Sequence, residues 1–389
     1  MNAVVEAVDD DEVLRIARAL IAAPSENPGG TEDEPAGVAA DVLASLGATP
    51  QIVRSEAGRP SVVATIGSDE GSSLAWNGHL DVVPAGDPAT WTRPPFEGAV
   101  EGGRLIGRGA ADMKGPVAAA LAAVAGVHRS GVALAGTLAM HLAADEELAG
   151  IHGTKVLWER GFLHQDACIV GEPSELQVGL AERGGAWITA TACGRAAHGS
   201  TPHLGVNAIT SMARFLLRIE EVLPDRHHAL VGRPTVNAAL ITGGSAPNVV
   251  PDRCEVDVDR RLIPGETSPH EVLAPFEHLA TEIRAEHPEV DLSFALREWT
   301  DAAEVSSETE IAALCRTAVA DETGTPPADV GFTGITDARF YINQAKIPTV
   351  ILGPGSLSVA HTANESVEVA ELVAAARIYA RVFVRFLGT

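Results

Sequence analysis

A histidine with a nearby carboxylate follows a short apolar segment of the chain. His79 comes just after the strand-like residues 74–76, and Asp81 stands two positions further on. A histidine at a strand end suits a metal ligand, and a neighbouring carboxylate can fix the tautomer of its imidazole. A loop histidine beside a solvated aspartate would give the same pattern, and for an isolated histidine that is the commoner case.

The glycine-rich segment 107–115 presents Asp112 in a turn before an expected helix. This segment matches neither the phosphate-binding loop of nucleotide hydrolases nor the dinucleotide fingerprint. A carboxylate has two oxygens and can bridge two cations, so the turn could hold Asp112 as a shared ligand. Capping of the helix by Asp112 is the alternative interpretation.

Carboxylates also follow two further expected strands. Asp145, Glu146 and Glu147 come after the apolar segment 137–142, and Glu172 comes after residues 167–170. Adjacent carboxylates at the end of a buried strand are costly unless a cation or a proton compensates them. An acidic helix N-terminus would explain the first group equally well, because the helix dipole favours negative charge there.

The same arrangement recurs along the chain, and this repetition decides between the interpretations. In open α/β sheets, the carboxyl ends of the strands form the ligand crevice. His361 lies in a loop of small residues before the last expected helix and adds a second imidazole. Chance is a poor explanation for the whole set. The sequence therefore predicts a metal site built from His79, Asp112, Glu147, Glu172 and His361.

The elements that must position these residues alternate between helix and strand in the first and last parts of the chain. Residues 181–293 differ, because their pattern reads β-α-β-β-α-β, the order of a ferredoxin-like unit. We expect an α/β fold with a discontinuous catalytic domain, residues 1–180 and 294–389. This domain should contain a mixed, mostly parallel sheet with helices on both faces, and residues 181–293 should form an inserted domain.

Composition limits the classes of partner. The formal net charge is −24, from 52 acidic and 28 basic residues, so nucleic acid and anionic membrane surfaces are not expected partners. No apolar run is long enough to span a bilayer, and the acidic N-terminal segment does not resemble a signal peptide. The four cysteines show no C-x-x-C spacing and suit a reducing compartment. We therefore expect a cytoplasmic protein.

Taken together, these segments resemble the dinuclear-zinc amidase and exopeptidase family of acetylornithine deacetylase, succinyl-diaminopimelate desuccinylase, aminoacylase and glutamate carboxypeptidase. The resemblance covers nearly the whole chain in the order of the family, and the set of motifs is far more specific than any one of them. The matching segments are residues 78–84, 91–96, 107–115, 145–147, 171–173, 198–200, 247–252, 259–261 and 361–362.

The resemblance implies a role for each matching residue. One metal ion would be held by His79, Asp112 and Glu172, and the other by Asp112, Glu147 and His361. Glu146 would be the general base and Asp81 the partner of His79. The metals would be two zinc ions, with cobalt or manganese as possible substitutes.

The resemblance also assigns residues of the inserted domain, which would serve as a lid and dimerisation domain in a homodimer. His198 would stabilise the oxyanion of the reaction. Asn248 and Arg261 would bind the carboxylate of the substrate, although the neighbouring Arg260 offers the same fork of donors.

The implied activity is hydrolysis of the amide bond in small N-acyl amino acids. The alternative is a metallo-carboxypeptidase or dipeptidase that acts on short peptides with the same centre. A catalytically silent binding protein is a third possibility, and the presence of Glu146 argues against it, because such a protein needs no general base.

Overall fold

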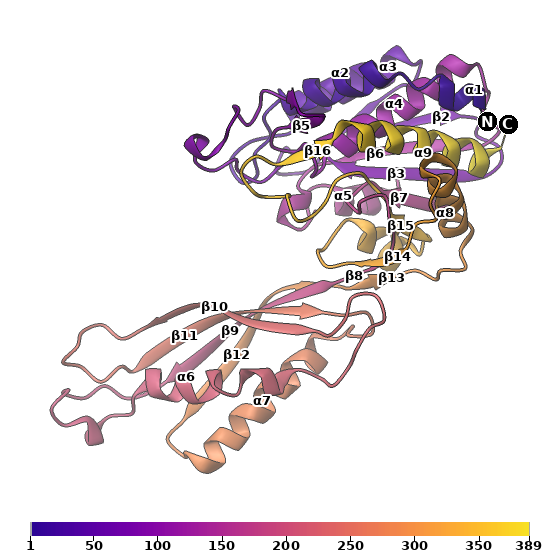
Figure 1. Ribbon diagram of the computed structural model, residues 1–389. Coiled ribbons are helices and arrows are strands. Elements are labelled where there is room, and N and C mark those ends of the chain that lie inside the picture. The colour runs from indigo at the N-terminus through magenta and orange to yellow at the C-terminus, as the bar shows by residue number, and fades with distance from the viewer. Residues whose placement is uncertain (1, 389) are drawn as a thin grey trace. The chain divides into compact units, whose positions relative to one another are not determined.

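A large mixed β-sheet is covered by helices (Figure 1), and both ends of the chain contribute elements to these layers. The structure is a computed structural model that describes residues 2–388. Its contacts divide the chain into two units, one comprising Met1–Leu180, Glu304–Phe332 and Thr336–Thr389, and the other comprising Ala181–Ala303 and Thr333–Ile335.

The central strands of the large sheet are parallel, and the outer ones are antiparallel. Strands β6, β3, β7 and β15 run in the same direction, whereas β1, β2 and β8 pair antiparallel with their neighbours. The spatial order is β1 (Gln51–Arg54), β2 (Pro60–Gly67), β6 (Thr137–Ala143), β3 (Ser73–His79), β7 (Ala167–Val170), β15 (Thr349–Ile351), β8 (Val178–Glu182) and β13 (Ala303–Glu304), with β14 (Asp329–Phe332) paired to β8. The prediction of a mixed sheet is confirmed.

Helices cover both faces of this sheet, and two adjacent residues of β3 show why. Trp76 packs edge-on against Tyr379 of α9 (Val369–Leu387), with ring centroids 5.6 Å apart. Ala75 points to the other face, into a cluster with Leu157 of α5 (Thr154–Glu159) and Tyr341 of the π-helix η5 (Phe340–Ala345). Because successive side chains of a strand point to opposite faces, β3 must be covered on both.

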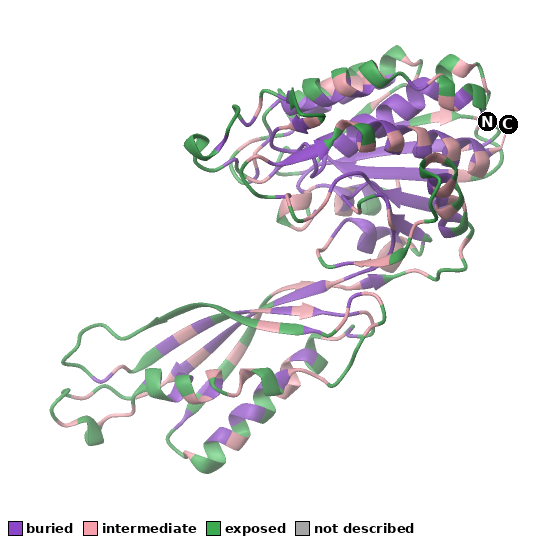
Figure 2. Cartoon of the chain, in the orientation of Figure 1, coloured by how far each residue is buried: buried purple, intermediate pink, exposed green. Residues whose placement is uncertain are grey.

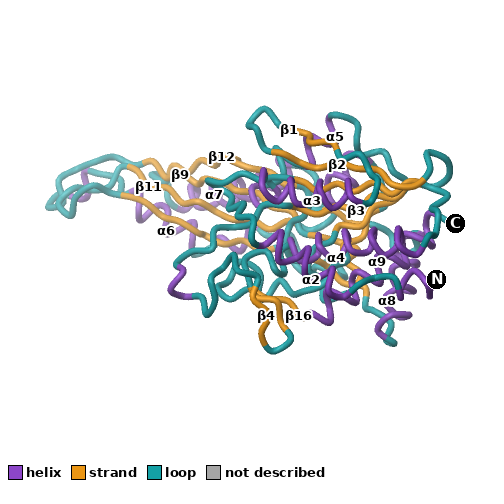
Figure 3. The backbone as a smooth tube through the Cα atoms, turned by 90° about the horizontal axis from the view of Figure 1, so that it is seen from above, coloured by secondary structure: helices purple, strands orange, loops and turns teal. Residues whose placement is uncertain are grey.

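The face that Trp76 contacts carries a layer of helices from both ends of the chain. Figure 3 shows α2 (Asp10–Ile21), α4 (Lys114–Ser130) and α9 over the sheet, and α2 and α9 both contact α4. Most residues of α4 are buried, as expected for an alanine-rich helix enclosed by neighbours. The layer is completed by α1 (Asn2–Glu6), α3 (Asp33–Ser45) and α8 (Glu310–Thr323). Burial follows the same layers, with the sheet and α4 largely buried (Figure 2).

A small sheet joins the C-terminal part of the chain to the loop region before α4. Its strands are β16 (Ser366–Glu368), β5 (Arg104–Ile106) and β4 (Ala99–Glu101), in that order. The pairing of β16 with β5 brings the segment that contains His361 close to the segment that contains Asp112.

The second unit is a four-stranded antiparallel sheet with two helices. Its elements are β9 (Gly184–Cys193), α6 (Ala208–Leu216), β10 (Thr235–Gly243), β11 (Arg253–Leu262), α7 (Pro269–Glu286) and β12 (Asp291–Thr300). The strands lie in the order β10-β11-β9-β12. Both helices pack on a core that includes Phe215, Phe276 and Val256. The expected β-α-β-β-α-β unit is thus present in the chain.

The second boundary of this unit lies further along the chain than the expected residue 293. Strand β12 pairs with β9 from Asp291 to Thr300, so residues 294–300 belong to the antiparallel sheet. The sequence pattern alone does not set this end of the strand, because β9 supplies the ladder partner that extends it. No helix among residues 2–388 combines the length and apolar character that a bilayer span requires.

Candidate metal centre

Neighbouring parallel strands bring the candidate ligands of the first unit to one edge of the sheet. His79 is the last residue of β3, and Glu172 follows the end of β7. Glu147 lies in the short 3₁₀ helix η2 (Glu146–Leu148), which follows β6. Since β6, β3 and β7 are adjacent and parallel, their carboxyl ends lie side by side.

Asp112 lies between two histidines and offers one oxygen to each. Its Oδ1 is 3.0 Å from Nε2 of His79, and its Oδ2 is 3.3 Å from Nε2 of His361. The same nitrogen of His79 is 3.6 Å from Oε1 of Glu172. On the other side, Nε2 of His361 is 3.0 Å from Oε2 of Glu147. Asp112 therefore lies where a bridging carboxylate would be needed.

The side chains form two groups that could each hold a metal ion. One group is His79, Asp112 and Glu172; the other is Asp112, Glu147 and His361. Within each group, the ligand atoms lie within 4.8 Å of one another. Imidazole with carboxylate is a donor set suited to Zn²⁺ and related divalent ions, so the residues present fit a dinuclear centre.

The electrostatics of the site are those of a cluster that needs positive charge. Burial, together with the charge of Asp112, raises the pKa of Glu172 well above its usual value, and the same causes raise the pKa of Glu147. Hydrogen bonds to Asp112 and Glu147 raise the pKa of His361 to about 10. Burial lowers the pKa of His79, but the bonds to Asp112 and Asp81 outweigh this effect and raise it. Divalent cations would replace these protons.

Glu146 lies next to the ligands but belongs to neither group. Its Oε2 is 3.9 Å from Nε2 of His79, beyond hydrogen-bonding distance. Burial is the main cause of a pKa well above the usual value for this carboxyl. A buried carboxylate that is not committed to a metal keeps its basicity, which is what a general base requires.

Asp81 supports both His79 and the turn that carries the two glutamates. The Asp81 carboxylate lies 3.5 Å from Nδ1 of His79, and the backbone oxygen of Asp81 lies 2.9 Å from the same nitrogen. Asp81 also accepts hydrogen bonds from the backbone N–H groups of Glu146 and Glu147, at 3.1 and 3.2 Å. One buried carboxylate thus orients a ligand and anchors the turn.

Two supporting residues were missed in the sequence. The first is Asn27, whose amide donates to Asp81 at 2.9 Å and to Asp145 at 3.0 Å, while its oxygen accepts from Arg59 at 3.2 Å. Arg59 also pairs with the fully buried Glu32. The segment around Asn27 reads as an ordinary turn, because Asn, Pro and Gly are common in turns, so nothing local marks its role.

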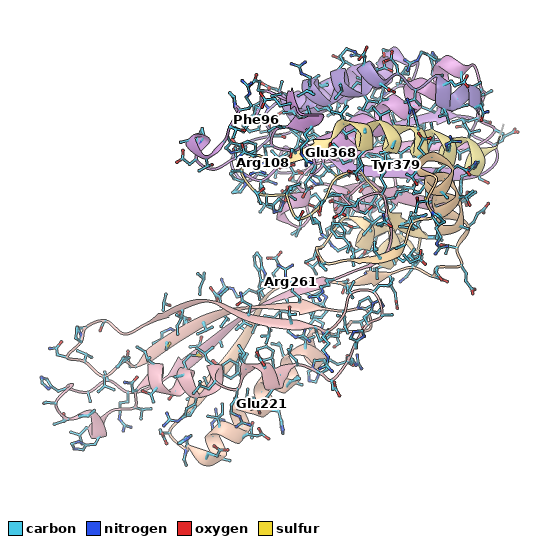
Figure 4. All side chains as sticks on the ribbon, in the orientation of Figure 1. Phe96, Arg108, Glu221, Arg261, Glu368 and Tyr379 are labelled. Carbon is cyan, nitrogen blue, oxygen red and sulfur yellow. The ribbon has the colours of Figure 1, made fainter. Side chains whose placement is uncertain are left out.

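The second missed residue is Glu365, which holds the turn of Asp112. Its Oε1 accepts from the backbone N–H groups of Ala111 and Asp112, at 2.9 and 3.0 Å. Its Oε2 pairs with Arg108 at 2.6 Å. Arg108 lies between β5 and α4 (Figure 4) and stacks over the ring of Trp91 at 5.3 Å. In the sequence, the only sign of a role for Glu365 was that it lies four residues after His361.

The other residues expected to take part lie in the second unit. His198 forms a β-bridge with Val249, and the neighbouring Gly199 donates its N–H to the oxygen of Asn248 at 2.7 Å. His198 and Asn248 are therefore on adjoining loops. Arg261 lies on β11 (Figure 4) with a partly exposed side chain, 3.0 Å from Asp259.

The structure distinguishes the two neighbouring arginines. Arg260 is buried and paired with Glu266 at 2.5 Å, inside the second unit. Successive strand residues point to opposite faces, so Arg261 points away from this interior. Arg260 is therefore occupied within the fold, and Arg261 remains the candidate for binding a carboxylate.

The chain is similar over most of its length to several known proteins. Residues 75–385 match the model of peptidase family M20/M25/M40. Succinyl-diaminopimelate desuccinylase of Paracoccus denitrificans is 31% identical, over 90% of this chain and 92% of that protein. N-formyl-4-amino-5-aminomethyl-2-methylpyrimidine deformylase of Halalkalibacterium halodurans is 29% identical, over 93% and 91%. The solved structure of an M20 metallo-carboxypeptidase from Sulfolobus solfataricus has the same fold, with a TM-score of 0.79, 20% identity and coverage of 96% and 98%.

Proposed function

Because this chain belongs to peptidase family M20/M25/M40 and is a metal-dependent hydrolase, we propose that it cleaves the amide bond of small N-acyl amino acids with a dinuclear zinc centre. The observation that carries the proposal is the position of Asp112 between His79 and His361. The family resemblance predicted from the sequence is confirmed. Zinc is proposed from the ligand chemistry, with cobalt or manganese as substitutes.

The proposed chemistry divides between the ions and the protein. Bound by the two groups of ligands, divalent ions supply Lewis acidity, which polarises a carbonyl and acidifies a water molecule. Glu146 then takes the proton of the attacking water and returns it to the leaving amine. His198 donates a hydrogen bond to the oxyanion, and Asn248 and Arg261 bind the substrate carboxylate. Asp81 keeps the imidazole of His79 oriented.

The role of Glu146 can be tested without disturbing the metal ligands. Glu146→Gln keeps the shape of the side chain and removes its basicity, so we expect kcat to fall by about 10²–10⁴-fold with two metal ions still bound per chain. The metal content is measured by mass spectrometry, and kcat is measured on the same sample. Glu159→Gln, at an exposed position of α5, is the matched control. Unchanged kcat in Glu146→Gln would remove this residue from the mechanism.

Which acyl group and which amine the substrate contains is a question for activity assays. The metal-loaded protein should be tested on succinyl-diaminopimelate, N-acetylornithine, other N-acyl amino acids and dipeptides. A second candidate function is cleavage of short peptides as a carboxypeptidase or dipeptidase. It is favoured by Arg261, because a partly exposed guanidinium suits any free carboxylate. Highest kcat/KM on a dipeptide or tripeptide would select that alternative.

We also propose that the second unit forms a homodimer through β10. This strand is an edge of the antiparallel sheet, and its Leu240 and Ile241 are 66% and 58% exposed. An exposed apolar edge strand is a template for pairing with another strand, and two copies can pair symmetrically. Leu240→Lys should shift the sedimentation coefficient from dimer to monomer. Ile151→Lys, at an exposed site of the first unit, should leave it unchanged.

A cytoplasmic location is the remaining part of the proposal. Cys168, Cys193, Cys254 and Cys315 are all free thiols. Three of them are buried, and burial raises the pKa of the Cys315 thiol, which keeps it unreactive. Free thiols are typical of a reducing compartment.

A further inference from the structure

The imidazole of His198 makes two contacts with a single neighbouring residue, and both are at the same nitrogen. Nδ1 of His198 lies 2.7 Å from the hydroxyl oxygen of Ser200. The backbone N–H of Ser200 points to that nitrogen as well, at 3.2 Å. No hydrogen bond to Nε2 of His198 is found within residues 2–388.

The backbone contact favours one protonation pattern of the ring. A backbone N–H can only donate, so it is satisfied at Nδ1 when this nitrogen carries no proton. In a neutral imidazole with a bare Nδ1, the proton is on Nε2. With Nδ1 unprotonated, the hydroxyl of Ser200 donates a hydrogen bond to the lone pair of Nδ1. A proton on Nδ1 would instead face the N–H group directly.

We propose that Ser200 is a positioning residue, which holds His198 in the tautomer that carries its proton on Nε2. This inference rests on the proposed function, in which His198 donates a hydrogen bond to the oxyanion. Only the Nε2–H tautomer leaves a donor at the unoccupied end of the ring. Fixing it in advance removes a rearrangement that would otherwise accompany the reaction.

The loop around Ser200 is held in place by bonds that do not involve its side chain. Thr201 donates its backbone N–H to the oxygen of His198 at 2.8 Å, and Gly199 donates to Asn248 at 2.7 Å. A side-chain carbon at Gly199 would lie only 3.0 Å from the oxygen of Asn248, so the loops are in close contact. Removal of the Ser200 hydroxyl should therefore leave the loop folded.

The tautomer can be observed directly by NMR on the metal-loaded protein labelled with 15N-histidine. The His198→Gln variant identifies the signals of this ring. We expect Nδ1 at the chemical shift of an unprotonated nitrogen and Nε2 at that of a protonated one. The reverse assignment, or a ring averaged between both tautomers, would overturn the inference.

Kinetics of three variants test the contribution of the hydroxyl. Loss of a whole oxyanion donor costs ~10²–10³-fold in kcat, so Ser200→Ala, which only loosens the donor, should lower kcat on the order of tenfold at nearly unchanged KM. Ser200→Thr keeps the hydroxyl and should restore kcat. Thr201→Ala is the matched control, because its hydroxyl contacts the backbone of His198 and not the ring.

The outcomes separate this inference from the proposed function. If His198→Ala, which carries no donor, keeps full kcat, the oxyanion role of His198 fails, whatever the NMR experiment shows. If His198→Ala is impaired and Ser200→Ala equals the unmodified protein, the oxyanion role stands and positioning by the Ser200 hydroxyl is overturned. A loss of kcat in Thr201→Ala equal to that in Ser200→Ala would also overturn it, since the effect would then belong to the loop.

Discussion

At the scale of single residues, Asn27 is a neutral group set among buried acids. Its amide hydrogens are shared between the carboxylates of Asp81 and Asp145, and Arg59 satisfies its oxygen. All three of its strong hydrogen-bonding functions are used, and its side chain is buried. Through Asp81 and Asp145, this amide keeps the turn of Glu146 and Glu147 in place.

Asn27→Asp should be strongly destabilising although the two side chains have the same shape. It adds a third carboxylate beside Asp81 and Asp145, where it can only accept and no longer donate. We expect the free energy of unfolding to fall by ~3–5 kcal/mol, measured by urea denaturation. Gln51→Glu makes the same chemical change at an exposed position of β1 and should cost little. Equal stability of both variants would contradict the role given to Asn27.

His141 should contribute a pH dependence of stability that is unrelated to the metal. It is buried in β6 with Nδ1 2.7 Å from the hydroxyl of Tyr341, and burial, aided by the charge of His164, lowers its pKa to about 3. The unfolded chain binds a proton at this residue below pH ~6.5 and the folded chain does not, so stability falls as the pH drops from 6.5 toward 3.

His141→Gln removes this proton-binding difference. Between pH 7.5 and 5, the unmodified apo protein should lose ~2 kcal/mol more stability than the variant, in urea titrations with a chelator present. The chelator matters because acid also releases metal. A variant with the same loss as the unmodified protein would mean that His141 is not a source of this dependence.

The residues that the sequence identified and those that it missed differ in a simple way. His79, Glu147 and Glu172 are charged or ligating groups after apolar segments, and such a contrast is visible in the sequence. Asn27 and Glu365 are functional only through partners that are far away in the chain. Their partners are known only once the fold is known, so no local pattern revealed Asn27, and only its nearness to His361 pointed to Glu365.

At the scale of elements, the close approach of two loops fixes the backbone of Glu172. Gly353 follows β15, and a side-chain carbon there would contact the backbone oxygen of Gly171 and lie 2.5 Å from that of Glu172. The strands β15 and β7 that lead into these loops are parallel neighbours. The glycine is therefore required by space, since a methyl group would displace the loop that carries Glu172, a proposed ligand.

Gly353→Ala should weaken metal binding more than it weakens the fold. An overpacked contact costs ~1–3 kcal/mol, and if most of it falls on Glu172, metal affinity drops by about tenfold or more. Competition with a chelator measures this affinity. Gly37→Ala is the control, because it lies in α3 with nothing near the added carbon, and there alanine should be neutral or stabilising. Unchanged affinity in Gly353→Ala would contradict the steric argument.

The order of the elements could be predicted better than their ends. The ferredoxin-like order, which includes helix α7, followed from the sequence pattern, and the structure adds that Ser268 caps this helix. Helix α6 ends at Leu216, whereas the sequence pattern continues to Val222, and residues Ile219–Val222 form a 3₁₀ turn. Short strands such as β8 and β13 were not predicted, because their stability comes from ladder partners rather than from their own pattern.

At the scale of the whole molecule, the net charge of −24 should make stability depend on salt. Repulsion among like charges opposes the compact state, and dissolved ions screen it. We expect the Tm of the metal-loaded protein to rise between low ionic strength and about 1 M KCl, where the Debye length is only ~3 Å. Calorimetry at several KCl concentrations measures this. A Tm that falls across the range would show that favourable ion pairs outweigh the excess charge.

The two histidines of the proposed metal centre are accessible to very different degrees. The side chain of His79 is 1% exposed, and that of His361 is 53% exposed on a loop. An ion held by His361 can therefore exchange with solution after a small movement of one loop, whereas an ion held by His79 must leave past the edge of a packed sheet. Dilution or mild chelation should thus yield a long-lived form with a single ion per chain before the empty protein appears.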